Sequence, residues 1–329
     1  MNQPREIRWG IMGAGRMAAK FASDLPRVPG ARLAAVGSLS MRRAEAVVQP
    51  YAGARAHNSY EALAADPDVD IIYVATRNPQ HCPCARLSLD AGKPVLCEKP
   101  FSMNTAEARQ MIDLARERKL FLMEALWTRF FPAVREMMRL IEDGAIGPTR
   151  MINVNFGYAG DPDPKGRLLN PAQGGGTLMD VGVYAIALAN MLFGRSRRVS
   201  SFASMGATGV DEALAILMQF AGGQLATCNC SITLHTFKEA DIIGATGRIR
   251  IHEPCWKPHT LSLVYHGKEP RVISHPYPGL GYQFEIAEVM RCLREGLLEC
   301  PLMPLDDTLA VMEVVDACRS QWKHMYRQP

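Results

Sequence analysis

The feature that most restricts the fold is the glycine pattern at residues 13–18, Gly-Ala-Gly-Arg-Met-Ala, which directly follows the apolar run at residues 7–12. A G-x-G-x-x-A pattern between a buried strand and a helix is typical of dinucleotide-binding domains. Gly13 allows a tight turn, Gly15 lets the backbone approach a pyrophosphate, and Ala18 lets the helix pack closely on the strand. Helix N-termini bind phosphates through their backbone N–H groups. The predicted pyrophosphate contacts are Gly13, Gly15, Arg16 and Met17.

Apolar strands and helical segments alternate through the first 124 residues. Further strands are expected at residues 32–37, 69–76, 94–97 and 120–124, with a helix at residues 105–119. This alternation predicts a doubly wound parallel sheet with helices on both faces, which is the Rossmann type of α/β fold. We therefore assign residues 1–124 to a dinucleotide-binding domain.

After residue 124 the strand-like segments follow one another without helices between most of them. They lie at residues 149–158, 199–206, 212–220, 224–234, 237–243 and 247–251, with one helix expected from Pro132 to Gly144. Consecutive strands predict a largely antiparallel open sheet, and Gly222-Gly223 predicts a two-residue hairpin turn. Residues 125–329 are therefore predicted to form an α+β domain for substrate binding and oligomerisation. The last helix, at residues 306–322, could pack on either domain.

The segment after the second strand, residues 38–43, indicates which cofactor the domain prefers. An NAD site places Asp or Glu there to hold the ribose 2′-hydroxyl group, and this chain has neither. Hydroxyl and guanidinium groups could instead bind a 2′-phosphate, although the two arginines could simply be solvated at the start of a helix. We expect NADP, with NAD less favoured. The residues predicted to bind the adenosine end are Ser38, Ser40, Arg42 and Arg43.

Two further strand ends should face the cofactor. Glu98-Lys99-Pro100 follows the strand at residues 94–97, and a lysine at the carboxyl end of a parallel strand can reach a ligand lying across the sheet. After the strand at residues 69–76, Asn78 is expected to cap a helix whose first residue is Pro79. His81 could line the cofactor cleft or simply begin that helix. The cofactor contacts predicted from these two strand ends are Thr76, Asn78, His81, Glu98 and Lys99.

One helix of the second half combines a carboxylate with a phenol. Gly174-Gly175-Gly176 precedes a helical segment in which Asp180 and Tyr184 are four residues apart, so they share one helix face. The two groups could therefore act in the same cleft. Two structural interpretations remain open, because Thr177-x-x-Asp180 resembles a capping box and Tyr184 could be a core residue.

Together these motifs resemble the Gfo/Idh/MocA oxidoreductase family over nearly the whole chain. The resemblance is carried by Cys97–Pro100, Phe121–Pro132, Gly174–Tyr184, Pro254-Cys255-Trp256 and Cys292–Gly296. It implies a cis peptide before Pro100 and dimers formed through the exposed face of the second sheet. There are two departures: Arg77 stands where the family usually has proline, and the acidic residue expected near Ser40 is missing. The resemblance implies a catalytic group of Lys99, Asp180 and Tyr184, and a pocket walled by Trp127, Arg129 and Phe156.

The expected chemistry is reversible hydride transfer between the nicotinamide of NADP and a hydroxyl carbon of a sugar or a trans-dihydrodiol. Tyr184 would exchange the hydroxyl proton, with Lys99 lowering the pKa of the phenol, while Asp180 would orient Lys99 or bind a substrate hydroxyl. Lys99 itself could be the acid–base group. The alternatives are another sugar or polyol dehydrogenase, a ketosugar reductase, or an NADP-binding sensor without catalysis.

Composition argues against several other classes. The net charge of +4 is small and dispersed, so we expect no nucleic acid as partner. No membrane span is expected, because no apolar run approaches about 18 residues. The nine cysteines include Cys82-x-Cys84 and Cys228-x-Cys230, which lack the C-x-x-C spacing of zinc and redox motifs. We therefore expect reduced thiols, no metal and a cytoplasmic location.

Overall fold

The computed structural model describes residues 5–325, with the side chains of residues 5–323, and the chain divides into two compact units. The first unit contains the chain up to Trp127 together with Pro278–Leu305, and the second contains Thr128–Tyr277 and the chain from Asp306 onward. The chain thus returns to the first unit for one helix, α8 (Tyr282–Arg294). The predicted division at residue 124 missed this return. A helix pattern shows which face is apolar, but it does not show which sheet that face will cover.

The first unit is a six-stranded, wholly parallel sheet in the order β3-β2-β1-β4-β5-β6, which confirms the predicted Rossmann architecture. Strands β4 and β5 are buried along their whole length, which explains why apolar residues dominate them, with Glu98 at the end of β5 as the charged exception. The strand order reverses between β1 and β4, and ligands of such sheets bind at the carboxyl ends of the strands at this point. The strands are β1 (Ile7–Met12), β2 (Ala31–Gly37), β3 (Arg55–His57), β4 (Ile71–Val74), β5 (Val95–Glu98) and β6 (Leu122–Ala125).

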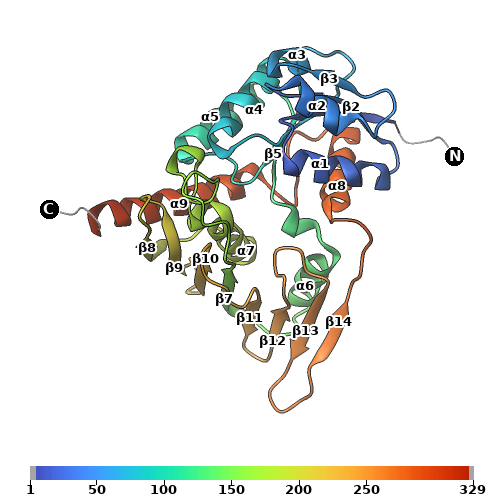
Figure 1. Cartoon of the computed structure of the whole chain (residues 1–329). Helices are drawn as coiled ribbons and strands as arrows, with labels where there is room; N and C mark the ends of the chain where they lie inside the picture. The colour runs from blue at the N-terminus through green and yellow to red at the C-terminus, as the bar shows by residue number, and fades with distance from the viewer. Residues whose placement is uncertain (1–4, 326–329) are drawn as a thin grey trace. The chain divides into compact units, whose positions relative to one another are not determined.

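Helices connect these strands and cover the sheet (Figure 1). Helices α4 and α5 pack side by side, and α1 packs against α8. The start of α5 is fixed by a reciprocal cap, in which Asn104 accepts from the N–H of Glu107 at 2.9 Å and Glu107 accepts from the N–H of Met103 at 3.0 Å. The helices are α1 (Arg16–Asp24), α2 (Met41–Val48), α3 (Tyr60–Ala64), α4 (His81–Asp90) and α5 (Thr105–Arg118).

The second unit is built on an eight-stranded sheet in the order β14-β13-β12-β11-β7-β10-β9-β8. Among the described strands, β7 and β10 pair in parallel and the other neighbours are antiparallel, as predicted for an α+β unit. Two of its strands, β13 and β14, were not predicted. The strands are β7 (Thr149–Gly157), β8 (Arg198–Met205), β9 (Asp211–Gln219), β10 (Leu225–Ser231), β11 (Ala240–Gly244), β12 (Arg248–Ile251), β13 (Thr260–Val264) and β14 (Arg271–Ser274).

The hairpin between β9 and β10 has a three-residue loop, so the predicted two-residue turn is wrong. The N–H of Phe220 donates to the carbonyl of Gln224 at 3.0 Å, and the N–H of Gly223 donates back to Phe220 at 3.1 Å. Gly223 has a φ of +81°, the left-handed conformation that ends this type of loop. The second glycine is therefore the one that the turn requires.

In the described part of the chain, the α-helices of the second unit are α6 (Pro132–Glu142), α7 (Val183–Phe193) and α9 (Leu305–Met325). Helix α9 is attached to β8, because Gln321 accepts from the N–H of Ser201 at 2.8 Å and donates to the carbonyl of Val199 at 2.9 Å. This places the last helix with the second unit. The stretch Pro171–Phe193 has the length and apolarity of a membrane span, but 78% of its apolar window is buried, as in the core helix of a globular unit.

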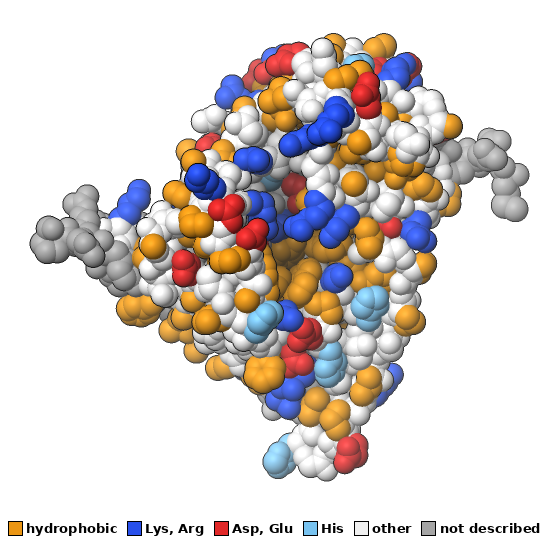
Figure 2. Space-filling model, viewed as in Figure 1, with side chains coloured by type: hydrophobic (Ala, Val, Ile, Leu, Met, Phe, Trp, Pro, Cys, Tyr) orange, Lys and Arg blue, Asp and Glu red, His pale blue; other side chains and the backbone are white. Residues whose placement is uncertain are grey.

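Charged side chains are distributed without a dominant sign. On the face seen in Figure 2, basic and acidic side chains of the described residues lie among one another and among apolar ones. All nine cysteines are buried, and none forms a disulfide in the part of the chain that the structure describes.

Candidate active site

The turn after β1 has the geometry of a pyrophosphate site. Gly13 has a φ of +103°, and a Cβ there would lie 2.7 Å from the carbonyl oxygen of Ala75, so only glycine fits. A Cβ at Gly15 would meet open space. No described side chain caps α1 at Gly15, so the N–H groups of its first turn are available to an anion. Arg16 is exposed beside them, and Met17 is half-buried.

The structure brings Arg43 to this same turn. A hollow of about 320 Å³ is lined by Gly15 at the start of α1, by Arg43 on α2 and by Tyr51. Arg42 and Ser40 are also at the surface there, with Ser40 at the N-cap position of α2. The hydroxyl of buried Ser38 accepts from the N–H of Ser40 at 3.2 Å, which fixes the loop. A guanidinium group thus faces the space beside the phosphate turn, and no carboxylate lines that hollow among the described residues.

The end of β4 differs from the prediction. Asn78 does not cap α4; it begins a 3-10 turn, Asn78–Gln80, and α4 starts at His81. Pro83 accounts for this, because it has no N–H to donate and is tolerated only in the first helical turn. Thr76 and Asn78 remain at the strand's carboxyl end.

His81 has a structural task instead of an exposed position in a cleft. It is 1% exposed, with Nδ1 2.7 Å from the carbonyl oxygen of Pro100 and Nε2 3.3 Å from that of Thr76. Burial lowers the pKa of the ring to about 4, so the imidazole is neutral and donates from one nitrogen. His81 therefore ties the end of β4 to the loop after β5, and its contact with the cofactor stays a prediction.

Lys99 lies directly after β5 and is half-buried, and its peptide bond to Pro100 is cis, as the resemblance implied. Glu98 beside it is 7% exposed and occupied on both oxygens, because it accepts from the hydroxyl of Tyr73 and from the N–H of Lys99 at 3.1 Å. Glu98 therefore helps to position the loop that carries Lys99, and its contact with the cofactor stays a prediction.

In the second unit, the carboxylate of Asp180 forms hydrogen bonds with Arg167 and Tyr158, which were not predicted from the sequence. Its Oδ1 lies 2.5 Å from Nη1 of Arg167, and its Oδ2 accepts from the hydroxyl of Tyr158. Burial and the charge of Asp180 raise the pKa of Tyr158, so this phenol stays protonated and donates. The carboxylate is thus held between one cation and one neutral donor.

Asp180 is not a helix cap, so the capping-box interpretation is wrong. Thr177 already has helical dihedral angles, and its side chain forms no cap bond. The cap comes from β9, where Oδ2 of Asp211 accepts from the N–H of Leu178 at 2.6 Å. Residues Leu178–Gly182 form a π-helical turn before α7, and such turns occur frequently at functional sites.

Aromatic rings surround this helix. The ring of Tyr184, on α7, lies 5.8 Å from that of Phe156, which stacks on Trp256 at 4.2 Å. The hydroxyl of Thr128 donates to the carbonyl of Trp256 at 2.7 Å and fixes that segment. Tyr184 and Phe156 are therefore neighbours, as an aromatic pocket wall requires, and Trp256 joins them.

The other two predicted pocket residues have different surroundings. Trp127 belongs to the first unit, and its ring lies 4.6 Å from that of Tyr282 on α8. Arg129 is 5% exposed and pairs with Asp307 at 2.7 Å, which links the segment after Trp127 to α9. A pocket role for Arg129 stays a prediction.

Family comparisons agree with this architecture. A model described as "Oxidoreductase family, NAD-binding Rossmann fold" matches residues 7–126, and one described as "GFO/IDH/MocA C-terminal domain" matches residues 134–250. Trans-1,2-dihydrobenzene-1,2-diol dehydrogenase of Macaca fascicularis is 36% identical over 324 residues, covering 95% of this chain and 96% of that protein. The chain belongs to the Gfo/Idh/MocA oxidoreductase family. The enzyme of the same name from Danio rerio is 36% identical, with 98% of each chain covered.

Solved structures of the family share the fold along the whole chain. An aldose-aldose oxidoreductase from Caulobacter crescentus has a TM-score of 0.87 at 26% identity, covering 97% of this chain and 98% of that one. A 3-ketoreductase from Actinomadura kijaniata, in complex with NADP, has a TM-score of 0.86 at 24% identity, covering 96% and 98%. As a family member, this chain is an oxidoreductase whose first unit is an NAD-binding Rossmann domain, which confirms the sequence-based resemblance.

Proposed function

We propose that this protein is an NADP-dependent dehydrogenase that transfers hydride reversibly between the nicotinamide and a hydroxyl carbon of a sugar or a trans-dihydrodiol. The observation that carries the proposal is the set of contacts that Asp180 makes and its place in the chain. It has no capping role, it is held by Tyr158 and Arg167, and it precedes the helix that bears Tyr184. The names of the relatives support the substrate class, since they are a dihydrodiol dehydrogenase and an aldose oxidoreductase.

NADP fits the residues of the first unit. Gly13, Gly15 and the start of α1 would hold the pyrophosphate, and Arg43 beside them would neutralise a 2′-phosphate. Because no carboxylate follows β2 before α2, the 2′-phosphate would meet no repulsion there. When bound, the nicotinamide would accept or supply the hydride.

The proton would be exchanged at the phenol oxygen of Tyr184. A free tyrosine titrates near pH 10, so its pKa must fall by about 2–3 units for it to act as a base near neutral pH. We propose that the ammonium group of Lys99 provides this shift and that Lys99, Asp180 and Tyr184 act on the same substrate.

Arg167 resolves a difficulty in this scheme. An uncompensated Asp180 would raise the pKa of a nearby phenol and so oppose the effect of Lys99. The guanidinium group at 2.5 Å compensates that charge within the second unit. Asp180 can then accept a hydrogen bond from a substrate hydroxyl without making Tyr184 a weaker acid.

We also propose that two copies associate through the open face of the second sheet. Phe202 on β8 is 64% exposed and Leu217 on β9 is 48% exposed, although both lie in strands whose alternate residues are buried. Exposed apolar side chains on one sheet face are typical of protein interfaces.

The function is tested by steady-state assays of nicotinamide absorbance with NADP⁺ and NAD⁺ and with D-xylose, D-glucose and an aromatic trans-dihydrodiol. We expect turnover of at least one of these substrates, with NADP⁺ preferred over NAD⁺. Tight NADPH binding without turnover of any substrate, in either direction, would contradict catalysis and favour a sensor.

A further inference from the structure

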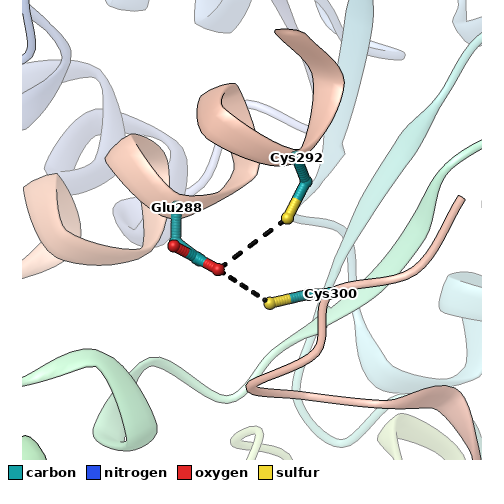
Figure 3. Close-up of side chains that lie close together, drawn as sticks. All are labelled: Glu288, Cys292 and Cys300. Carbon is teal, nitrogen blue, oxygen red and sulfur yellow. Dashed lines mark hydrogen bonds between the residues drawn. The ribbon is translucent and has the colours of Figure 1, made fainter. Parts of the chain in front are cut away.

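Two cysteines that the proposed mechanism does not use converge on one carboxylate (Figure 3). Cys292 lies on α8 and Cys300 lies in the turn that follows it, and both are 0% exposed. Their Sγ atoms lie 3.8 and 3.5 Å from Oε1 of Glu288. All three potential ligand atoms lie within 4.8 Å of one another. The cysteines are eight residues apart in the sequence, a spacing that matches no common metal motif.

The separations are those of a metal site. With Zn–S bonds of about 2.3 Å and Zn–O bonds of about 2.1 Å, tetrahedral angles place sulfur and oxygen about 3.6 Å apart. The two observed sulfur–oxygen distances, 3.5 and 3.8 Å, lie on either side of that value. A disulfide bond between the two cysteines would need only their sulfur atoms, about 2.05 Å apart, and would leave the nearby carboxylate without a role.

The turn that contains Cys300 is held by its own backbone. The turn is closed by a hydrogen bond of 3.0 Å from the N–H of Met303 to the carbonyl of Cys300. This bond helps to hold the sulfur of Cys300 beside Glu288.

Arg291 holds the carboxylate of Glu288 in place. Its Nε donates to Oε2 of Glu288 at 3.0 Å, and its Nη2 donates to Oε1 at 2.7 Å. Carboxylates that bind metals are commonly oriented by such hydrogen bonds. The same guanidinium group also pairs with Glu295, so its charge is shared between two carboxylates. A divalent cation would offset the charge of two thiolates whose sulfurs are fully buried.

We propose that Glu288, Cys292 and Cys300 bind a thiophilic divalent cation, Zn²⁺, through one oxygen and two sulfurs. Thiolate ligands select Zn²⁺ over Mg²⁺ and Ca²⁺, which prefer oxygen. The fourth position is left to water, which the 14% exposure of the Glu288 side chain admits. The ion would fasten the end of α8 to the turn that leads to α9. This site is independent of the proposed catalytic function.

The site is tested on the full-length protein, stripped of metal under reducing conditions and titrated with Co²⁺. We expect one equivalent to bind, with a thiolate-to-cobalt charge-transfer band and the visible bands of tetrahedral cobalt. Zn²⁺ should displace the cobalt and raise the thermal unfolding midpoint, because a ligand that binds only the folded state stabilises it.

Variants locate the ion. Cys292→Ser and Cys300→Ser should each abolish the charge-transfer band. Glu288→Gln should weaken Co²⁺ binding but keep the band, because the two sulfur ligands are unchanged. Cys228→Ser, which changes a buried cysteine of β10, is the matched control and should keep the band. The Co²⁺ titration of the wild-type protein tests the proposal even if the variants fold poorly. Absence of the band at excess Co²⁺ would overturn the proposal, as would isolation of the native protein with a disulfide between these two cysteines.

Discussion

The proposed chemistry depends most directly on two residues, because Lys99 supplies a positive charge and Tyr184 exchanges a proton. We predict that Lys99→Met and Tyr184→Phe each lower turnover by about 10²–10⁴-fold, the usual contribution of general acid–base catalysis. NADPH affinity, measured by fluorescence titration, should change little in Tyr184→Phe, whose residue is not among the predicted cofactor contacts. Tyr265→Phe is a matched control, since its hydroxyl bonds only the carbonyl of Ala145 among the interactions found. Turnover close to wild type in both catalytic variants would refute the assignment.

Arg167 offers a sharper test of the charge argument. Arg167→Met leaves the charge of Asp180 uncompensated, which should make Tyr184 harder to deprotonate. In the oxidation direction, the pH at which turnover rises should therefore move upward by about one unit. Tyr158→Phe removes only a neutral donor, so it should shift the profile less. An unchanged profile in Arg167→Met would show that this ion pair does not influence the proton transfer.

Glu285 on α8 is a buried acid that costs stability. It is 0% exposed, neither oxygen has a hydrogen-bond partner in the described structure, and burial followed by the charge of Glu98 raises its pKa well above the ordinary 4.5. The folded state therefore keeps the proton that the unfolded state loses above about pH 4.5, so folding stability falls as the pH rises beyond that value. Glu285→Gln should remove this loss. Its advantage in urea unfolding should grow by about 1.4 kcal/mol per pH unit above pH 4.5, and an advantage independent of pH would contradict the explanation.

The start of the helix that bears Tyr184 depends on a residue from another element. Asp211 of β9 caps Leu178, and a Cβ at Gly176 would lie 2.2 Å from Oδ1 of Asp211, so the strand and the helix start approach closely. Asp211→Ala should destabilise the protein by about 1–2 kcal/mol through loss of the cap and should lower turnover by disturbing Asp180. Asp211→Asn keeps an acceptor oxygen and should restore most of both. Equal losses in the two variants would show that the cap is not the cause.

That cap also shows where sequence reasoning succeeds and where it stops. Strands β1, β2 and β5 were predictable because the buried positions of parallel strands form short apolar runs. The sequence suggested Thr177 and Asp180 as a capping pair because their local spacing is right. The residue that caps Leu178 is Asp211, which lies 33 residues away in the sequence. Arg167 and Tyr158 were missed for the same reason, since they meet Asp180 only in the folded chain. Strands β13 and β14 are short and at a sheet edge, where the apolar signal is weak.

At the scale of the whole molecule, the proposed dimer depends on the open face of the second sheet. Phe202 pairs in register with Ala215, two residues before Leu217, so Phe202 and Leu217 lie on the same face of neighbouring strands. On the opposite face, their neighbours Ala203, Ile216 and Met218 are buried. The apolar side chains of Phe202 and Leu217 thus lie on the sheet face opposite to the buried one, and none of the described helices covers them.

Charges placed on this face should separate the two copies, because burying an unpaired charge costs several kcal/mol in an interface. We predict that Phe202→Arg combined with Leu217→Arg converts a dimer to a monomer in light scattering after size exclusion. Leu298→Arg, at a 42% exposed position in the first unit, is the matched control and should remain dimeric. NADPH binding should survive in the separated copies, because the predicted phosphate contacts all lie in the first unit. A wild-type protein that is monomeric at micromolar concentration, or a double variant that stays dimeric, would exclude this face as the interface.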